Sequence, residues 1–171
     1  TYASGSKWNT YLPETYILPR RIKGVTAVSF GFNQKVHVKG FSFQKLEKAF
    51  ARLTAAENDA LYGDSFRPAG DWVEDIGNNV TLCFDDMDFT ARVPGRISIE
   101  GRTSLEINSI RLRLTPVDGG EEFVQALPFR RSGEYEAREF VLDPVRPGLY
   151  RAECVFLPGS SFDFAAFRFS D

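Results

Sequence analysis

Apolar and polar residues alternate in short segments along most of the chain, and this pattern restricts the fold more than any other feature. Side chains on a β-strand point to opposite faces in turn, so a two-residue period predicts strands that are buried on one face. β-Branched and aromatic residues fill these segments, and Gly, Pro and Asp-Gly separate them. The segments cover residues 26–32, 35–43, 79–89, 96–101, 109–117, 138–142, 149–156 and 164–169.

The connections between these segments also favour a β-sheet protein. Asp118-Gly119-Gly120 predicts a hairpin turn before the segment Glu121–Leu127. The one helix-like stretch is Gln44–Asp59, for which we expect at most a turn or two of helix. Many short strands without helices between them indicate an antiparallel β-sandwich or jelly roll. We therefore predict an all-β fold of two facing antiparallel sheets, with a core supplied largely by the 16 Phe residues.

Charge and hydropathy exclude two classes of partner. A net charge of −2 offers no basic footprint for nucleic acid, and no apolar run has the length of a membrane span. We expect neither partner. The residues Thr1–Gly5 lack the basic and apolar regions of a signal peptide, and the chain has no initiator Met, so we expect a fragment of a longer protein.

An internal repeat bears on the domain organisation. Gly24–Phe43 and Gly148–Phe169 each begin with Gly, continue through an alternating segment and a polar break, and end in Phe-x-Phe. We interpret residues 1–46 as the last strands of a preceding similar module plus a linker, and residues 47–171 as a complete module. Chance similarity between two amphipathic hairpins is the alternative. Because unpaired apolar strands seek partners, we expect residues 1–46 to pack on the complete module or to self-associate.

The residue types of common catalytic and metal sites do not cluster in this sequence. Cys83 and Cys154 lie in apolar strand patterns, which predicts buried thiols and allows a disulfide only if the two strands face each other. His37 is distant from both cysteines in the sequence, which argues against zinc. The acids Asp85, Asp86 and Asp88 are typical of a solvated strand end rather than of a glycosidase carboxylate pair. We therefore assign no catalytic residue.

Two segments resemble a known family. "ENDALYGDSF" (Glu57–Phe66) followed by "IGNNVTLCFDDMDF" (Ile76–Phe89) is similar to the accessory region near the C-terminus of bacterial family 2 glycoside hydrolases of the β-galactosidase type. That region resembles carbohydrate-binding module family 6, which is a galactose-binding-like jelly roll. "SIRLRL" (Ser109–Leu114) matches the central strand of such modules, and "GEYEAR" (Gly133–Arg138) lies where they carry Gly-Gly-Trp.

This resemblance implies a non-catalytic module that binds carbohydrate, such as a galactose-containing glycan, and has the catalytic domain of its parent enzyme as a partner. The alternative is a structural or oligomerisation domain of that enzyme that has lost sugar binding. The parent would be bacterial, and either a cytoplasmic or a secreted location is open.

The resemblance also implies a sugar site among the loops at one edge of the sandwich. The two aromatic positions of the family fall on Asp75 and Tyr135, its Asn position falls on Asp163, and Trp72 can replace the missing ring. Rings cover the apolar face of a pyranose, and carboxylates accept hydrogen bonds from its hydroxyls. Asn78 completes the candidate set. The alternative roles are packing for Trp72 and Tyr135, and turn formation for Asn78.

The resembling modules often hold a structural calcium ion with acidic groups from the first and last strands. Glu57 matches one such ligand, but the other expected acids are replaced by Ala55 and Ala165. Glu57 is thus the single metal-ligand candidate, and we expect no other cofactor.

Overall fold

A computed structural model describes residues 11–16, 18, 25–33, 35–43 and 47–171. The chain divides into two compact units, residues 1–44 and residues 45–171.

The described residues of the first unit form no strand, so the strands predicted at residues 26–32 and 35–43 are wrong within that part of the chain. Alternation favours a strand only where a neighbouring strand accepts its backbone hydrogen bonds. Aromatic contacts are present instead: the Phe41 ring lies 4.8 Å from Phe30 and 5.9 Å from Phe43. The repeat that begins at Gly24 starts outside the described residues, and its origin in a preceding module stays a prediction.

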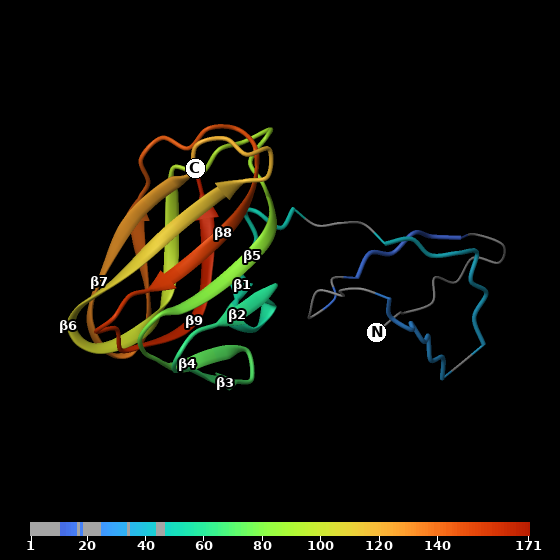
Figure 1. The fold of residues 1–171 in the computed structure, drawn as a ribbon. Helices are drawn as coiled ribbons and strands as arrows, with labels where there is room; N and C mark the ends of the chain where they lie inside the picture. Colours follow the sequence, from blue (N-terminus) through green and yellow to red (C-terminus); the bar gives the residue numbers. More distant parts are fainter. Residues whose placement is uncertain (1–10, 17, 19–24, 34, 44–46) are drawn as a thin grey trace. The chain divides into compact units, whose positions relative to one another are not determined.

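The second unit is an antiparallel β-sandwich, which confirms the predicted fold class (Figure 1). Its one short helix is the 3-10 turn η1, so residues 47–59 contain no more helix than expected. The described residues contain no helix with the length and apolar character needed to cross a membrane. The elements are β1 (Leu53–Thr54), η1 (Ala55–Glu57), β2 (Ala60–Tyr62), β3 (Arg67–Ala69), β4 (Trp72–Ile76), β5 (Val80–Asp88), β6 (Arg96–Pro116), β7 (Phe123–Val141), β8 (Leu149–Phe156) and β9 (Phe162–Ser170).

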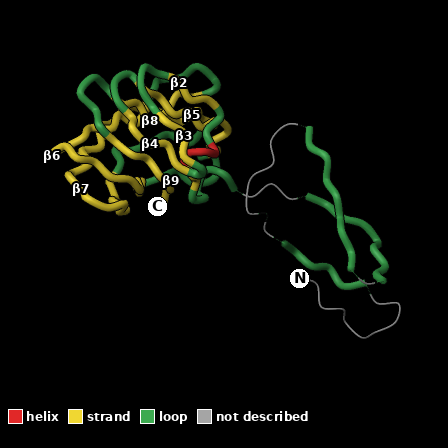
Figure 2. The backbone as a smooth tube through the Cα atoms, turned by 90° about the horizontal axis from the view of Figure 1, so that it is seen from below, coloured by secondary structure: helices red, strands yellow, loops and turns green. Residues whose placement is uncertain are grey.

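Two long strands connect the layers of this sandwich. Strand β6 pairs with β9 through its first half, from Arg96 to Arg102, and with β8 through its second half, from Ile110 to Pro116. Strand β7 runs beside β6 over most of its length. The other strands are hydrogen-bonded in the order β2-β5-β8 on one side of β6 and β9-β4-β3 on the other side. Strand β1 pairs with β9. The sheet therefore curls so that its two halves face each other (Figure 2).

Phenylalanine fills the space between the two layers, as expected from the composition. Phe84 of β5 meets Phe167 of β9 at a ring distance of 4.6 Å, and Phe89 meets Phe169 at 5.2 Å. All four side chains are buried. Removing one such ring from water contributes about 1.5–3 kcal/mol, so these contacts hold the sheet in its curled form.

The two cysteines lie on adjacent strands but on opposite faces of the sheet. Cys83 of β5 is opposite Glu153 of β8, and the next residue, Cys154, points into the core. Both are free thiols, and this geometry prevents a bond between them. Burial raises the pKa of Cys83 to about 11 and the pKa of Cys154 to about 12.

Candidate functional site

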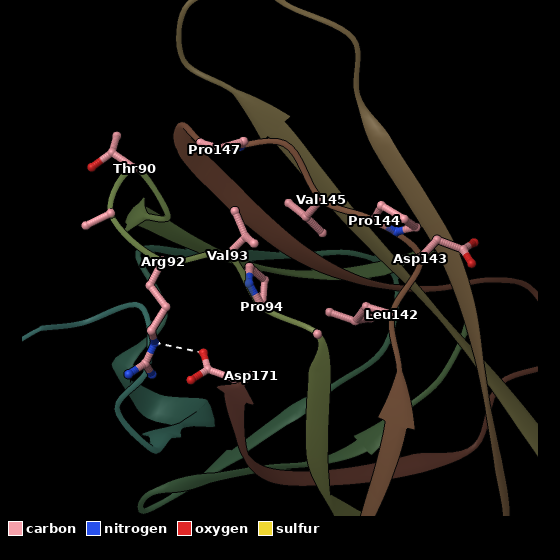
Figure 3. Close-up of a pocket in the computed structure, with 12 residues that line it drawn as sticks. Thr90, Arg92, Val93, Pro94, Leu142, Asp143, Pro144, Val145, Pro147 and Asp171 are labelled. Atoms are coloured by element: carbon pink, nitrogen blue, oxygen red, sulfur yellow. Dashed lines mark ion pairs between the residues drawn. The ribbon is translucent and has the colours of Figure 1, made fainter.

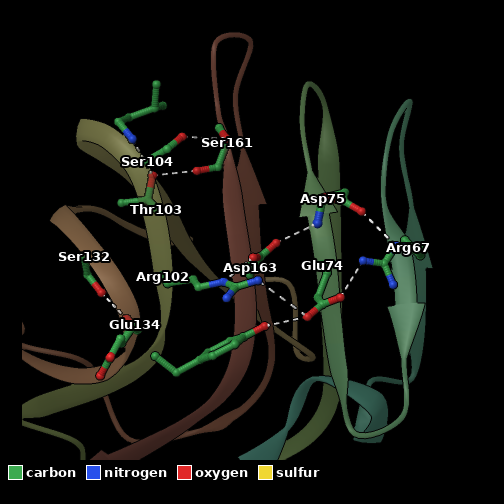
Figure 4. A network of polar contacts seen from close by, with 12 residues as sticks. Arg67, Glu74, Asp75, Arg102, Thr103, Ser104, Ser132, Glu134, Ser161 and Asp163 are labelled. Carbon is green, nitrogen blue, oxygen red and sulfur yellow. Dashed lines mark hydrogen bonds and ion pairs between the residues drawn. The ribbon is translucent and has the colours of Figure 1, made fainter.

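Five neighbouring strands place one polar or aromatic side chain each in a line across the sheet (Figure 4). Arg67 of β3 is opposite Glu74 of β4, and Arg102 of β6 is opposite Asp163 of β9. Their strand neighbours Val73 and Phe164 are buried, so the line runs along the outer face of the layer. We call this line the polar row; it consists of Arg67, Glu74, Asp163, Arg102 and Tyr135.

Charge pairs and one hydroxyl connect the polar row. Arg67 donates to Glu74 at 2.6 Å, and Arg102 donates through Nε to Asp163 at 2.6 Å. The Tyr135 hydroxyl donates to Glu74 at 3.0 Å. Desolvation by burial, followed by this hydrogen bond, raises the pKa of Tyr135 above its ordinary value. The side chains of Glu74 and Asp163 are only 15% and 17% exposed, whereas those of Arg67 and Arg102 are 58% and 41% exposed, so solvent partly screens these ion pairs.

A bulge at Asp75 fastens β4 to β9. The pairing register between these strands shifts between Val73 and Ile76, and Asp75 has a φ of 55°. The Asp75 N–H donates to Asp163 at 2.8 Å, and the Asp75 carboxylate accepts from Arg67 at 2.8 Å. Asp tolerates the left-handed conformation because its short side chain can bond locally. The bulge therefore adds Asp75 to one end of the polar row.

The ring of Trp72 lies beside the row, against the ring of Tyr135. The rings of Trp72 and Tyr135 are 4.5 Å apart, and the Arg102 guanidinium lies 4.8 Å from the centre of the Tyr135 ring. Tyr135 is half-buried between these two neighbours, whereas Trp72 is 42% exposed. Trp72 is thus the ring of this pair that is open to a ligand, and Tyr135 supports it.

The structure thus gathers Trp72, Asp75, Tyr135 and Asp163 into one place, together with three residues that the sequence did not indicate: Arg67, Glu74 and Arg102. These three join the predicted residues through the hydrogen bonds described above. Their polar character at alternate strand positions was visible, but their cross-strand partners depend on the register.

Asn78 has a different place from the other candidates. Its side-chain oxygen accepts from the Gly159 N–H at 2.7 Å, which joins the turn after β4 to the loop after β8. The neighbouring Asn79 has a φ of 56° and donates to Asp64 at 2.8 Å. Both contacts are those of turn residues. The hydrogen-bond partner of Asn78, Gly159, is not part of the polar row.

A groove lies next to the polar row, between the middle of β6, the middle of β7 and the beginning of β9. Its volume is about 460 Å³. The Thr103 hydroxyl donates to the Ser161 carbonyl at 2.6 Å across its floor. We call it the donor groove; its lining residues are Arg102, Thr103 and Ser104 of β6, Arg131, Ser132 and Gly133 of β7, and Ser161, Phe162 and Asp163 at β9.

A second groove, of about 660 Å³, opens between the segments that follow β5 and β7 (Figure 3). Val93, Pro94 and Pro144 line it, and Arg92 pairs with Asp171 at its edge at 3.0 Å. None of the predicted site residues lies here.

The predicted metal ligand Glu57 forms part of the cap of the short helix η1. Its carboxylate accepts from the Thr54 N–H at 2.9 Å and from the Thr54 hydroxyl at 3.3 Å. Ala55 and Ala165 are buried beside the first and last strands. The described residues contain no group of three His, Cys, Asp or Glu side chains arranged for a metal. Calcium takes six to eight oxygen ligands, so this donor set does not fit the calcium site of the resembling family.

Comparison with known proteins identifies the fold. No protein-family model matches the sequence, and no curated protein matches it. A family 6 carbohydrate-binding module from Clostridium cellulolyticum, solved with xylose, has a TM-score of 0.59 at 19% identity, covering 72% of this chain and 98% of that one. A β-1,3-glucan-binding family 6 module from Bacillus halodurans has a TM-score of 0.60 at 16% identity, covering 74% and 100%. This chain has the jelly-roll fold of those modules.

A third such module, from Clostridium stercorarium, was solved with cellobiose and has a TM-score of 0.58 at 18% identity, covering 72% of this chain and 95% of that one. These modules support the family 6 part of the resemblance at the level of fold. The connection to family 2 glycoside hydrolases stays a prediction.

Proposed function

We propose that this protein is a non-catalytic carbohydrate-binding module. The observation that carries the proposal is the exposed ring of Trp72, backed by Tyr135 and placed beside the charged groups of the polar row. A pyranose presents an apolar C–H face to such a ring and hydroxyls to neighbouring charged groups. The fold adds support, because modules of this fold were solved with xylose and cellobiose.

The site geometry favours weak, reversible binding. Trp72 stands on an open sheet face, so a sugar there buries little surface, and one ring contributes only on the order of 1 kcal/mol beyond its area. We expect dissociation constants of roughly micromolar to millimolar. Weak binding suits a module that keeps an enzyme near a polymer, since attachment raises the local concentration of substrate.

The parent enzyme that we propose is a bacterial family 2 glycoside hydrolase of the β-galactosidase type, and the glycan is galactose-containing. Support comes from the sequence resemblance of Glu57–Phe66 and Ile76–Phe89. In this proposal residues 1–46 are the end of a preceding module, and catalysis belongs to another domain.

Affinity gel electrophoresis tests the proposal. Gels containing galactan, xylan or β-1,3-glucan should retard the wild-type chain, and Trp72→Ala should remove the retardation. Tyr62→Ala is the matched control, because Tyr62 is an exposed aromatic residue on β2, away from the polar row. Normal mobility of the wild type in every gel would contradict the proposal.

A structural or oligomerisation domain is the second candidate. It is favoured by two hydrogen bonds that hold the site together without a ligand, from the Tyr135 hydroxyl to Glu74 and from Arg102 Nε to Asp163. Such a domain would show no retardation in any glycan gel, and Trp72→Ala would change its sedimentation instead.

A further inference from the structure

We infer that the donor groove binds the acidic group of an anionic saccharide, either a carboxylate or a sulfate. The inference rests on the proposed carbohydrate-binding function and names the class of ligand. It comes from the hydrogen bonds in the groove. The carboxylate that lines the groove already accepts hydrogen bonds from the protein, whereas its guanidinium groups have N–H donors without a hydrogen-bond partner among the described residues.

The one carboxylate in the groove is already engaged. Asp163 accepts from the Asp75 N–H at 2.8 Å through one oxygen and from Arg102 Nε at 2.6 Å through the other. Little of its side chain faces solvent. Asp163 therefore holds Arg102 in place and offers few free lone pairs to a ligand.

Two guanidinium groups retain free donors. Within the described part of the chain, Arg102 and Arg131 each make their side-chain hydrogen bonds through Nε alone, to Asp163 and to the Ser104 carbonyl. A terminal nitrogen of Arg102 lies 3.8 Å from Glu74, and a terminal nitrogen of Arg131 lies 3.7 Å from Glu106; both are ion pairs longer than a hydrogen bond. Arg131 is 62% exposed. The terminal N–H groups are thus available in the groove.

These donors favour an anion over a neutral hydroxyl. A guanidinium presents parallel N–H groups that match the two oxygens of a carboxylate or sulfate, and such charge-assisted bonds are stronger than those to neutral acceptors. The Ser132 hydroxyl already donates to the Glu134 carbonyl. The hydroxyls of Ser104 and Ser161 are 3.4 Å apart and share one hydrogen bond, so one of these two hydroxyls in the groove retains a free donor.

The donor groove also adjoins the two adjacent rings of Trp72 and Tyr135. Trp72 contacts Tyr135, Tyr135 contacts Arg102, and Arg102 forms one wall of the groove. An oligosaccharide that stacks one ring on Trp72 can therefore place an acidic substituent between Arg102 and Arg131. A neutral chain would leave these donors to water.

The test compares charged and uncharged forms of the same polymer with the full 171-residue chain. Polygalacturonate is compared with fully methyl-esterified pectin, and a sulfated galactan with its desulfated form, by isothermal titration calorimetry. Arg131→Gln removes one exposed charge from the groove. Arg146→Gln is the matched control, because Arg146 is also mostly exposed, at 78%, and pairs with Glu121 elsewhere on the sandwich.

We expect one charged polymer to bind about tenfold more tightly than its neutral form, and Arg131→Gln to remove that preference while Arg146→Gln keeps it. The preferred polymer then identifies the group as carboxylate or sulfate. Equal binding of charged and neutral forms, or an undiminished preference in Arg131→Gln, would overturn this inference and leave the proposed function intact. Absence of binding to every polymer would overturn both.

Discussion

Among single residues, Tyr135 joins the aromatic and charged parts of the site. Its hydroxyl donates to Glu74, whose carboxylate is mostly buried, and its ring lies between Trp72 and Arg102. Tyr135→Phe removes one hydrogen bond to a charged acceptor, so we expect the free energy of unfolding to fall by about 1–2 kcal/mol in urea titrations. Glycan binding should change little, because Trp72 keeps its support. Loss of binding with unchanged stability would contradict this assignment.

The raised pKa of Tyr135 adds a dependence on pH. The folded state binds the phenolic proton more tightly than the unfolded state, so protonated Tyr135 stabilises the fold. This stabilisation is fully present below the ordinary tyrosine pKa of about 10 and is lost as pH rises above it. We expect the wild type to lose more unfolding free energy than Tyr135→Phe between pH ~9 and ~11. The raised pKa values of Cys83 and Cys154 also lower the stability at high pH. Because the wild type and Tyr135→Phe both contain these thiols, the difference between the two proteins reports Tyr135 alone.

The thiols give a separate test of the sheet register. Cys83 is 1% exposed and Cys154 is 2% exposed, and burial raises the pKa of each. The thiolate is the reactive form, so Ellman's reagent should modify neither residue in the native protein and both residues in urea. Rapid modification of one thiol in the native state would show that solvent reaches it, which contradicts the burial of both residues.

At the scale of strands, the bulge in β4 depends on the left-handed backbone of Asp75. A β-branched residue is strained in this conformation, whereas glycine adopts it freely. Asp75→Val should destabilise the fold by about 1–2 kcal/mol, and Asp75→Gly should have little effect. Both variants lose the same exposed ion pair to Arg67, which is worth at most about 1 kcal/mol, so their difference reports the backbone. Equal stabilities in urea would contradict a left-handed Asp75.

The pairing of β6 with β9 requires glycine at position 101. A Cβ atom there would lie 2.5 Å from the Asp163 carbonyl and 2.5 Å from the Phe162 ring. We expect Gly101→Ala to cost about 1–3 kcal/mol, because the buried Phe162 ring must move. The same shift would displace Asp163 from Arg102, so glycan binding should weaken in calorimetry. Gly133→Ala is the control for stability alone, because a Cβ atom there would meet no atom within 4 Å but Gly133 lines the donor groove.

Strand patterns could be predicted where both periodicity and length were sufficient. Residues 79–89, 149–156 and 164–169 read clearly as strands because each alternates around buried aromatics, and β5, β8 and β9 occupy these places. Strands β2 and β3, with three residues each, were too short for a period to be visible. The predicted strands at 96–101 and 109–117 are one strand, β6, because pairing continues through irregular register near Thr103.

The site was only partly predictable for a related reason. The family resemblance indicated Trp72, Asp75, Tyr135 and Asp163 along the chain, but it carried no information about contacts across strands. Arg102 is opposite Asp163 only because β6 and β9 adopt one particular register, and that register depends on the packing of the whole core.

At the scale of the whole molecule, the two units differ in how they bury apolar side chains. The second unit encloses a continuous core that begins at Ala49 and Phe50. In the first unit, Phe30 and Phe41 are 54% and 66% exposed. Exposed aromatic groups of this kind are costly in water and promote association.

We therefore predict that the full chain self-associates through residues 1–46, whereas a chain of residues 45–171 stays monomeric. The shorter chain retains Phe50 and the ion pair of Lys48 with Asp59 at 2.7 Å, so its thermal unfolding should resemble that of the full chain. Sedimentation velocity over a range of concentrations measures the self-association, and calorimetry compares the thermal unfolding of the two chains. Replacing Phe30 and Phe41 by Ser in the full chain should abolish association, because these rings provide the apolar surface. A full chain that sediments as a monomer at every concentration would show that its aromatic side chains are covered within one molecule.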